Sequence, residues 1–209
     1  MQGKGRGPRE RIARAAATLF YQNGIHSTGV ELLTQEAKVS KRTLYQHFSG
    51  KNELVESYLR AIDERGGSPM EQRLDLPELP PRDRLLAIFD SSPVGRFRGC
   101  PFHNAAVESA GALAGVDDIV RAHKRSFAQR LVTIAAEVGA TDPYLLGNQL
   151  MVLFEGATAL ATSLNDTAPL LHARGAAAQL IEGATTPPHD GPNPKKTGIV
   201  RQRAASETR

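Results

Sequence analysis

The chain has 209 residues, of which 40% are hydrophobic and 23% are charged, so a globular core is expected. Its one cysteine, Cys100, excludes an internal disulfide and fits a reducing compartment. The basic N-terminus lacks the apolar segment of a signal peptide, and no uninterrupted apolar run reaches the length of a membrane span. We therefore expect a cytoplasmic protein that does not enter a membrane.

Charge is unevenly distributed along the chain. Residues 1–52 hold nine basic and three acidic side chains, residues 53–194 hold twelve and eighteen, and residues 195–209 hold five and one. A basic front on an acidic body indicates a polyanionic partner for the front. On charge alone, a merely solvated basic surface remains an equal alternative.

The first predicted helix covers residues 9–23 and ends at Asn23-Gly24. Its apolar side chains recur at the spacing of one buried helix face, and they are Ile12, Ala15, Ala16, Leu19 and Phe20. Thr28 is expected to cap a second helix, and Glu31 three residues later completes a capping box.

A third helix is predicted over residues 41–48, capped by Ser40. Leu44 and Phe48 lie four residues apart and form its buried side. A tight turn at Lys38-Val39 joins it to the second helix, which is the spacing of a helix-turn-helix. The opposite side of the third helix is then free to enter the major groove of DNA, which is wide enough for one helix.

The free side carries side chains suited to nucleic acid. The planar fork of Arg42 can bond O6 and N7 of guanine together, and lysines supply point charges for phosphates. The candidate DNA-contacting residues are Thr28, Ser40, Lys41, Arg42, Thr43, Tyr45, His47 and Lys51. Three alternatives stay open: Tyr45 as a core aromatic, His47 as an ordinary surface histidine, and Arg42 as a solubilising charge.

The rest of the chain is also predicted to be helical, with no alternation typical of strands. A fourth helix covers about residues 51–65, and a linker rich in glycine and proline follows it. Further helices are expected at about 82–91, 102–112, 115–138, 142–164 and 168–182. The segment from residue 184 onward is rich in Pro, Thr and basic residues and is expected to be disordered.

Residues 9–62 resemble the N-terminal domain of TetR-type (tetracycline-repressor-like) transcriptional regulators. The resemblance rests on the stretch RERIARAAATLFYQNGIHSTGVELLTQEAKVSKRTLYQHFSGKNELVESYLRA. It implies an all-α fold of about nine helices, with a helix-turn-helix DNA-binding domain at residues 1–50. A helical ligand-binding and dimerisation domain would cover residues 51–183, followed by the basic tail at residues 184–209.

The resemblance also implies a function. Members of this family are homodimers that usually repress transcription from palindromic operators, and a small molecule releases them from double-stranded DNA. The dimer would form through the last two long helices, residues 143–164 and 168–182. An ordinary intrachain core is the alternative for these two helices. The effector is unidentified.

Two positions depart from the family pattern. Gly29 stands where the family usually has a second Ser or Thr after the position of Thr28, so one phosphate-binding hydroxyl is missing. Lys38 stands in the turn where glycine is common, and a lysine in a left-handed conformation costs roughly 1 kcal/mol relative to glycine. Alternatively, the turn differs slightly and Lys38 contacts a phosphate.

The effector site is the least defined feature of the sequence. The chain has few aromatic residues and no tryptophan, so we expect a mainly aliphatic pocket with a few polar groups. The candidate lining residues are Phe89, Phe97, Phe102, His103, Asn104, Phe127 and Phe154.

Other chemistry has little support. No phosphate-binding loop, metal-ligand cluster or catalytic triad can be read, so we expect no enzyme, metal or cofactor. Cys100 and His103 supply two ligands, whereas a structural zinc site needs four. A thiol-based redox-sensing DNA-binding regulator remains the alternative function, because Arg96 and Arg98 would lower the pKa of Cys100.

Overall fold

The computed structural model describes residues 7–90 and 97–186, and the secondary structure of these two ranges is entirely helical. The elements are α1 (Pro8–Asn23), α2 (Val30–Ala37), α3 (Lys41–His47), α4 (Lys51–Asp63), the 3-10 helix η1 (Glu71–Asp75), α5 (Pro81–Ala87), α6 (Pro101–Ser109), α7 (Ala114–Glu137), α8 (Pro143–Leu164) and α9 (Ala168–Thr185). The predicted all-α class with about nine α-helices is thus confirmed for the described ranges.

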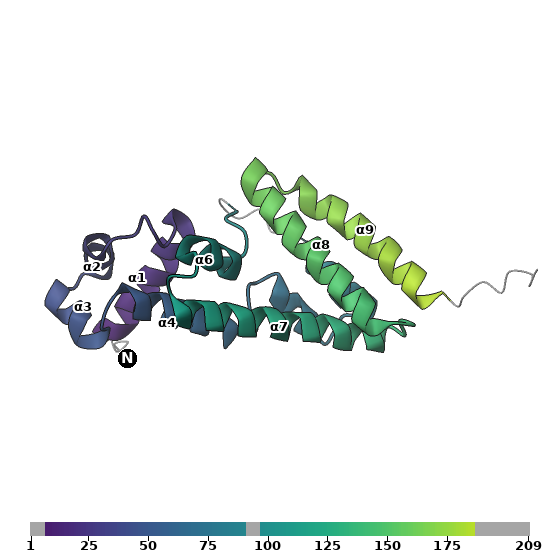
Figure 1. Ribbon diagram of the computed structural model, residues 1–209, viewed down its shortest axis with the longest axis horizontal. Coiled ribbons are helices and arrows are strands. Elements are labelled where there is room, and N and C mark those ends of the chain that lie inside the picture. The colour runs from purple at the N-terminus through teal and green to yellow at the C-terminus, as the bar shows by residue number, and fades with distance from the viewer. Residues whose placement is uncertain (1–6, 91–96, 187–209) are drawn as a thin grey trace, which may run out of the picture.

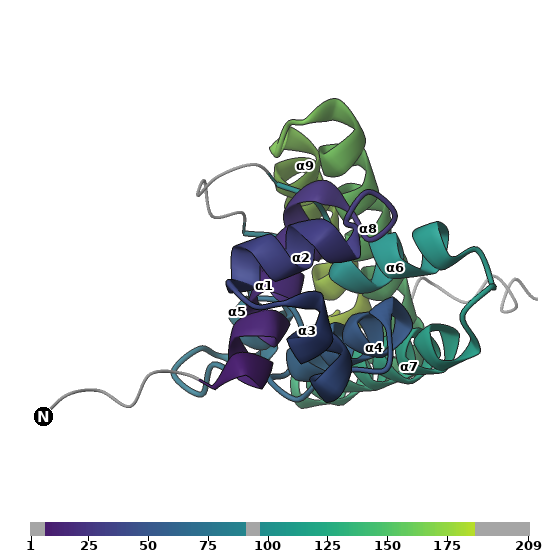
Figure 2. The same cartoon turned by 90° about the vertical axis from the view of Figure 1, so that its left-hand side faces the viewer.

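Helices α1 to α4 form a head at one end of an elongated molecule, and α7 runs from the head to the opposite end (Figure 1). Helices α8 and α9 lie side by side over the far half of α7, at the end away from α2 and α3. Seen from the head end, α1 to α3 stand in front of the other helices (Figure 2). Within the described ranges, no helix is both long enough and apolar enough to cross a membrane.

The head folds around the apolar face predicted for α1. All five expected side chains of that face are buried. They pack against Leu33 of α2, Leu44 of α3 and Leu59 of α4. Helix α1 ends because Gly24 adopts φ +93°, a conformation that glycine takes without the steric penalty of a Cβ.

Helix α3 is anchored as the sequence predicts. The Ser40 side chain accepts a hydrogen bond from the backbone N–H of Thr43 at 3.0 Å, which confirms the cap. Leu44 is 0% exposed and Phe48 is 1% exposed, so both hold α3 to the core. Lys38 occupies the left-handed conformation at φ 53°, ψ 52°, which confirms the strained turn expected there.

The predicted cap at Thr28 is wrong. Helix α2 begins at Val30, its N-cap is Gly29, and no side chain caps it. Thr28 is instead 0% exposed, and its hydroxyl donates to the carbonyl oxygens of Gly24 at 2.7 Å and Leu19 at 3.3 Å. The Thr28 hydroxyl thus joins the turn after α1 to the last turns of that helix.

The rest of the chain forms a second core. Leu146, Leu150 and Phe154 of α8 pack against Phe127 and Leu131 of α7, together with apolar side chains of η1, α5 and α9. The small residue Gly147 lets α7 and α8 approach closely. A Cβ built on Gly147 would lie 2.6 Å from a side-chain atom of Val132 and 2.8 Å from its Cα.

Helix α7 belongs to both cores. Val116, Ile119 and Val120 near its start join the head core, whereas its second half joins the core of α8 and α9. The sequence did not predict η1, which lies within the expected linker. The basic tail from residue 187 onward lies outside the described residues, and α9 extends to Thr185, past the predicted start of that tail.

Candidate nucleic-acid interface and cavity

The outer face of α3 is a compact polar surface on a helix whose other side is buried. Lys41, Arg42 and Tyr45 are exposed, Tyr45 to 53%, and Thr43 and His47 are half-buried. The exposure of Tyr45 removes the alternative that it is a core aromatic. The face has the width of one helix and carries donors and cations, as major-groove binding requires.

Two of the candidate DNA-contacting residues, Lys41 and Ser40, already have partners in the head. Lys41 forms an exposed ion pair with Glu31 of α2, and this contact raises the pKa of Lys41 and lowers the pKa of Glu31. The Ser40 hydroxyl is engaged in the helix cap and lies 2.9 Å from the Thr43 hydroxyl. Arg42 has no ion-pair partner within the described residues, so its guanidinium is available to an external acceptor.

The N-terminus of α4 borders this face. Lys51, its first residue, donates from Nζ to the carbonyl oxygen of His26 at 3.3 Å, which ties α4 to the turn between α1 and α2. The Ser49 N–H donates to the Glu53 carboxylate at 2.6 Å, and this backbone hydrogen bond lowers the pKa of Glu53. A carboxylate therefore already accepts from one backbone donor beside the start of α4. The burial of Thr28 contradicts the phosphate contact expected for its hydroxyl.

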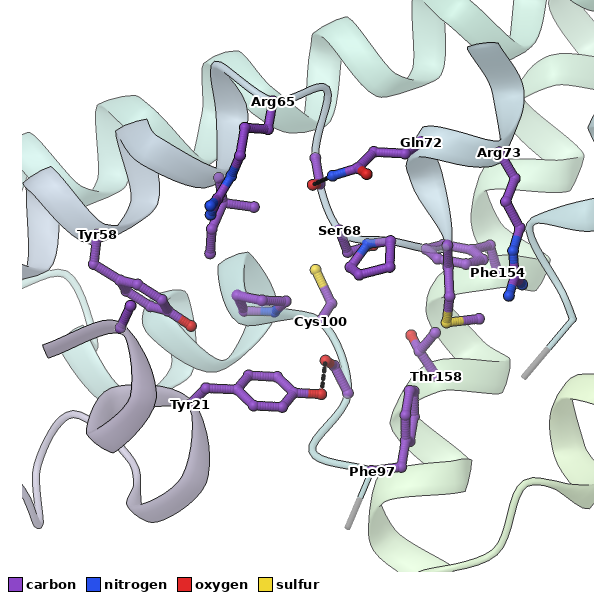
Figure 3. A pocket seen from close by; sticks show the side chains of 17 residues that line it. Tyr21, Tyr58, Arg65, Ser68, Gln72, Arg73, Phe97, Cys100, Phe154 and Thr158 are labelled. Atoms are coloured by element: carbon purple, nitrogen blue, oxygen red, sulfur yellow. Dashed lines mark hydrogen bonds between the residues drawn. The ribbon is translucent and has the colours of Figure 1, made fainter. Parts of the chain in front are cut away.

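A cavity of about 690 Å³ lies between the head and the rest of the chain (Figure 3). Residues from five parts of the chain line it: Ala17 and Tyr21 of α1, Tyr58 and Ile62 of α4, the segment from Arg65 to Arg73, the segment from Phe97 to Pro101, and Phe154 and Thr158 of α8. In Figure 3 the two tyrosines point into it on one side, and Phe154 and Thr158 face it from the other. A molecule bound there would contact both cores at once.

Tyr21 connects the head to the segment that leads into α6. Its hydroxyl donates to the carbonyl oxygen of Gly99 at 3.5 Å and accepts from the N–H of Arg98 at 3.3 Å. The Arg98 side chain returns to the Tyr21 carbonyl oxygen at 3.3 Å. At the other end of α6, Glu108 accepts a hydrogen bond from the backbone N–H of His26 at 2.7 Å. Helix α6 thus touches the cavity at one end and the turn between α1 and α2 at the other.

The structure places two of the predicted pocket residues in this lining, Phe154 and Phe97. Phe89 and Phe127 lie in the core behind it, with their rings 6.1 and 5.2 Å from that of Phe154. The other three candidates also lie outside the lining. Phe102 is buried against His123, His103 is exposed, and Asn104 donates to the Arg98 carbonyl oxygen.

The lining is also more polar than the expected aliphatic pocket. Sequence reasoning missed Tyr21, Tyr58 and Arg65 as lining residues. A tyrosine directly after the buried position Phe20 was the one local signal, because a large aromatic there lies beside the apolar face of α1.

Cys100 is 5% exposed, and burial raises the pKa of its thiol above the ordinary value. Its nearest cation is Lys124 of α7, whose Nζ lies 3.3 Å from the sulfur and is paired with Glu155 of α8. Redox-sensing cysteines are exposed and have a lowered pKa. The structure therefore argues against the redox-sensing alternative, and Arg96, one of its two supposed causes, lies outside the described residues.

A buried polar cluster stands behind the cavity wall. His123 of α7 contacts Asp63 at 2.8 Å through Nδ1 and Glu71 at 3.2 Å through Nε2, and its ring stacks on Phe102 at 3.5 Å. Burial acts to raise the pKa of Glu71, but His123 and the Ser68 N–H outweigh it, so this pKa lies below its ordinary value. Glu71 thereby fixes the segment that carries Ser68 into the cavity.

Known proteins resemble this chain over both parts. The family described as "Bacterial regulatory proteins, tetR family" matches residues 12–58. A TetR transcriptional regulator from Streptomyces avermitilis is 30% identical, with 86% of this chain and 98% of that one covered and a TM-score of 0.70. A TetR-family transcriptional regulator from Streptomyces coelicolor is 29% identical, with 88% and 92% covered and a TM-score of 0.74.

Among curated proteins, the HTH-type transcriptional regulator BetI of Vibrio vulnificus is 33% identical over 88 residues, which is 42% of this chain and 44% of BetI. UidR of Escherichia coli is 34% identical over 65 residues, which is 31% of this chain and 33% of UidR. These alignments span less than half the length of each curated relative.

The head, the anchored α3 and its exposed polar face define a DNA-binding protein of the helix-turn-helix class. The two Streptomyces structures extend the likeness through the helices beyond the head. The chain belongs to the TetR family of bacterial transcriptional regulators.

Proposed function

We propose that this chain is a homodimeric repressor that binds a palindromic operator and is released by a small molecule in the cavity. The observation that carries the proposal is the outer face of α3, where exposed Arg42 and Tyr45 flank a helix fixed by Leu44. We assign DNA reading to residues 1–50, which include α1 to α3, and effector binding and dimerisation to residues 51–183.

Each residue of the face has a proposed task. Arg42 reads a base through its fork, because its guanidinium has no ion pair among the described residues. Lys41 and Lys51 attract phosphates as point charges. Tyr45, His47 and Thr43 position the helix against the backbone of the DNA. Ser40 acts indirectly, by capping α3.

The exposed apolar side of α8 and α9 supports dimerisation. Val152 is 73% exposed, and four neighbouring large side chains share this exposure: Leu145, Leu160, Leu164 and Leu171. Gly156 and Gly175 lie among them with open space around them, which allows close approach of a second copy. A water-exposed apolar stripe of this kind marks an interaction surface.

Release follows from the position of the cavity. Two recognition helices of a dimer must lie about 34–36 Å apart to enter successive major grooves. A ligand that contacts α1 and α4 together with α8 favours one placement of the head over another. A coupling free energy of about 1–3 kcal/mol would change operator affinity by roughly 5- to 150-fold.

The test is a fluorescence-anisotropy titration of duplex DNA from the region upstream of the gene, at one stated salt concentration and with random DNA as competitor. We expect Arg42→Ala to weaken specific binding by about 1–3 kcal/mol and to relax preference at one base pair. Arg60→Ala is the matched control, because Arg60 is an exposed arginine in the last turn of α4. Equal affinity of wild type and Arg42→Ala would contradict the base-reading role.

Dimerisation is tested separately by sedimentation velocity. Val152→Glu places a charge on the exposed side of α8 and should yield monomers. Val107→Glu is the control, because Val107 is 64% exposed but lies on α6. If both variants sediment like the wild-type dimer, the interface lies elsewhere.

A further inference from the structure

We infer that the cavity binds an organic anion with an apolar, ring-containing body. The inference deepens the proposed function, since it names the chemical class of the effector. It rests on the charge of the lining, on an unpartnered hydroxyl inside it, and on the pairing of the carboxylates behind it.

The lining carries positive charge and no negative charge. Arg65 and Arg73 both contribute to it, and none of its residues is Asp or Glu. Arg73 is partly engaged, because it donates to the carbonyl oxygens of Ala87 and Asp90. No carboxylate of the described ranges pairs with Arg65, whose guanidinium reaches the cavity in Figure 3. A guanidinium without a carboxylate partner binds carboxylate, sulfonate or phosphate groups through two parallel hydrogen bonds.

Tyr58 supplies a second donor near Arg65. The residue is 7% exposed, and its hydroxyl lines the cavity without a hydrogen-bond partner in the described part of the chain. Burial raises the pKa of Tyr58, so the hydroxyl keeps its proton and remains a donor. An anion held by Arg65 could therefore accept a further hydrogen bond from this hydroxyl.

The acidic groups closest to the wall do not favour a cation. The Glu71 carboxylate is occupied by His123 and by the Ser68 N–H, and the Glu155 carboxylate is occupied by Lys124. Both carboxylates already have partners, so they offer little to a positively charged ligand. The charged side chains that line the cavity are its two arginines.

The remaining lining fits the body of such a ligand. Phe97, Phe154, Met70, Ile62 and Pro101 provide apolar contacts. The volume of about 690 Å³ lies in the range of roughly 300–1,000 Å³ that accommodates drug-sized molecules. An aromatic or alicyclic acid would place its charge at Arg65 and its rings toward Phe154.

The experiment compares two fluorescent probes that share one ring system. Anilinonaphthalene sulfonate carries a negative charge, and phenylnaphthylamine is its neutral counterpart. We expect the full chain to bind the sulfonate, and we expect Arg65→Gln to weaken that binding about tenfold or more, with Tyr58→Phe causing a smaller loss. Binding of the neutral probe should not change. Arg60→Gln is the control and should behave like wild type, because Arg60 is an exposed arginine of α4 that does not line the cavity.

The inference is overturned if the neutral probe binds as tightly as the sulfonate, or if Arg65→Gln binds the sulfonate like wild type. Because Arg65 is exposed, circular dichroism should show that this variant folds normally.

The same samples titrated with operator DNA separate the two proposals. Arg65-dependent sulfonate binding without loss of DNA affinity would support the anion site and contradict release by an effector. DNA binding without any sulfonate binding would overturn the anion site alone.

Discussion

The outer face of α3 and the cavity are built in opposite ways. The face is one short helix, and its polar side chains point outward from a backbone that Leu44 and Phe48 hold in place. The cavity is lined by parts of α1, α4 and α8 and by two connecting segments, and its wall is continuous with both cores. Substitutions on the face should therefore alter DNA binding without altering the free energy of unfolding. Substitutions of buried side chains at the cavity wall should alter both ligand binding and the free energy of unfolding.

Adjacent positions on α3 give the largest expected difference. Leu44→Ala removes a fully buried side chain and should lower the free energy of unfolding by about 2–5 kcal/mol. Tyr45→Ala removes an exposed one and should change it by no more than about 0.5 kcal/mol while weakening DNA binding. Urea unfolding of both variants measures the difference. Comparable losses of stability would show that the face and the core are not separable.

An intermediate effect is expected behind the cavity wall. Glu71→Gln replaces a buried carboxylate that contacts His123 and should cost about 1–3 kcal/mol of stability at neutral pH. The pKa of Glu71 is lowered in the folded state, so its contribution is present above the ordinary value of 4.5 and is lost as pH falls below it. The difference between wild type and Glu71→Gln should thus shrink in acid.

Urea unfolding at neutral pH and near pH 4 provides this comparison, and binding of the sulfonate probe provides a second readout. Because Glu71 also fixes Ser68, we expect the variant to bind the probe more weakly. A deficit that stays constant across this pH range would show that the pKa of Glu71 is the same in the folded and unfolded states. That result would contradict the lowered pKa.

The smallest effect is expected beside the face, at the ion pair between Glu31 of α2 and Lys41 of α3. Glu31→Gln removes the partner of Lys41 and leaves its ammonium free for a phosphate, so DNA affinity should rise about two- to fivefold. Stability should not change measurably, because the pair is exposed. Salt-dependent DNA titrations of wild type and variant test this, and the gain should fade at high salt. A loss of affinity would mean that Glu31 positions Lys41 productively.

Local patterns predicted most of the fold. The buried positions of α1 and the cap at Ser40 depend on residues a few positions apart, and the structure confirms both. The role of Thr28 could not be found this way, since its hydroxyl bonds the end of the preceding helix only after the turn at Gly24 has closed. The short helix η1 was missed because it is held by α7, to which Glu71 is bonded through His123.

The cavity was predicted poorly for the same physical reason. Tyr21, Tyr58 and Arg65 converge only when α1 and α4 pack together, and no spacing in the sequence encodes that convergence. For Cys100, sequence neighbours predicted an effect on the thiol that the folded structure does not support. Neighbouring arginines in the sequence suggested a lowered thiol pKa, but burial dominates and raises it.

The contact of α7 with α8 at Gly147 has a consequence for genetic variation. Every other amino acid carries a Cβ, and a Cβ there would overlap the backbone of Val132. Saturation mutagenesis should therefore record position 147 as depleted of all substitutions, including alanine. Gly156, nine residues later on the same helix with no atom within 4 Å of a built Cβ, should tolerate alanine in the isolated subunit. Two glycines of one helix would then differ in their mutational record because one meets a neighbouring backbone and the other meets open space.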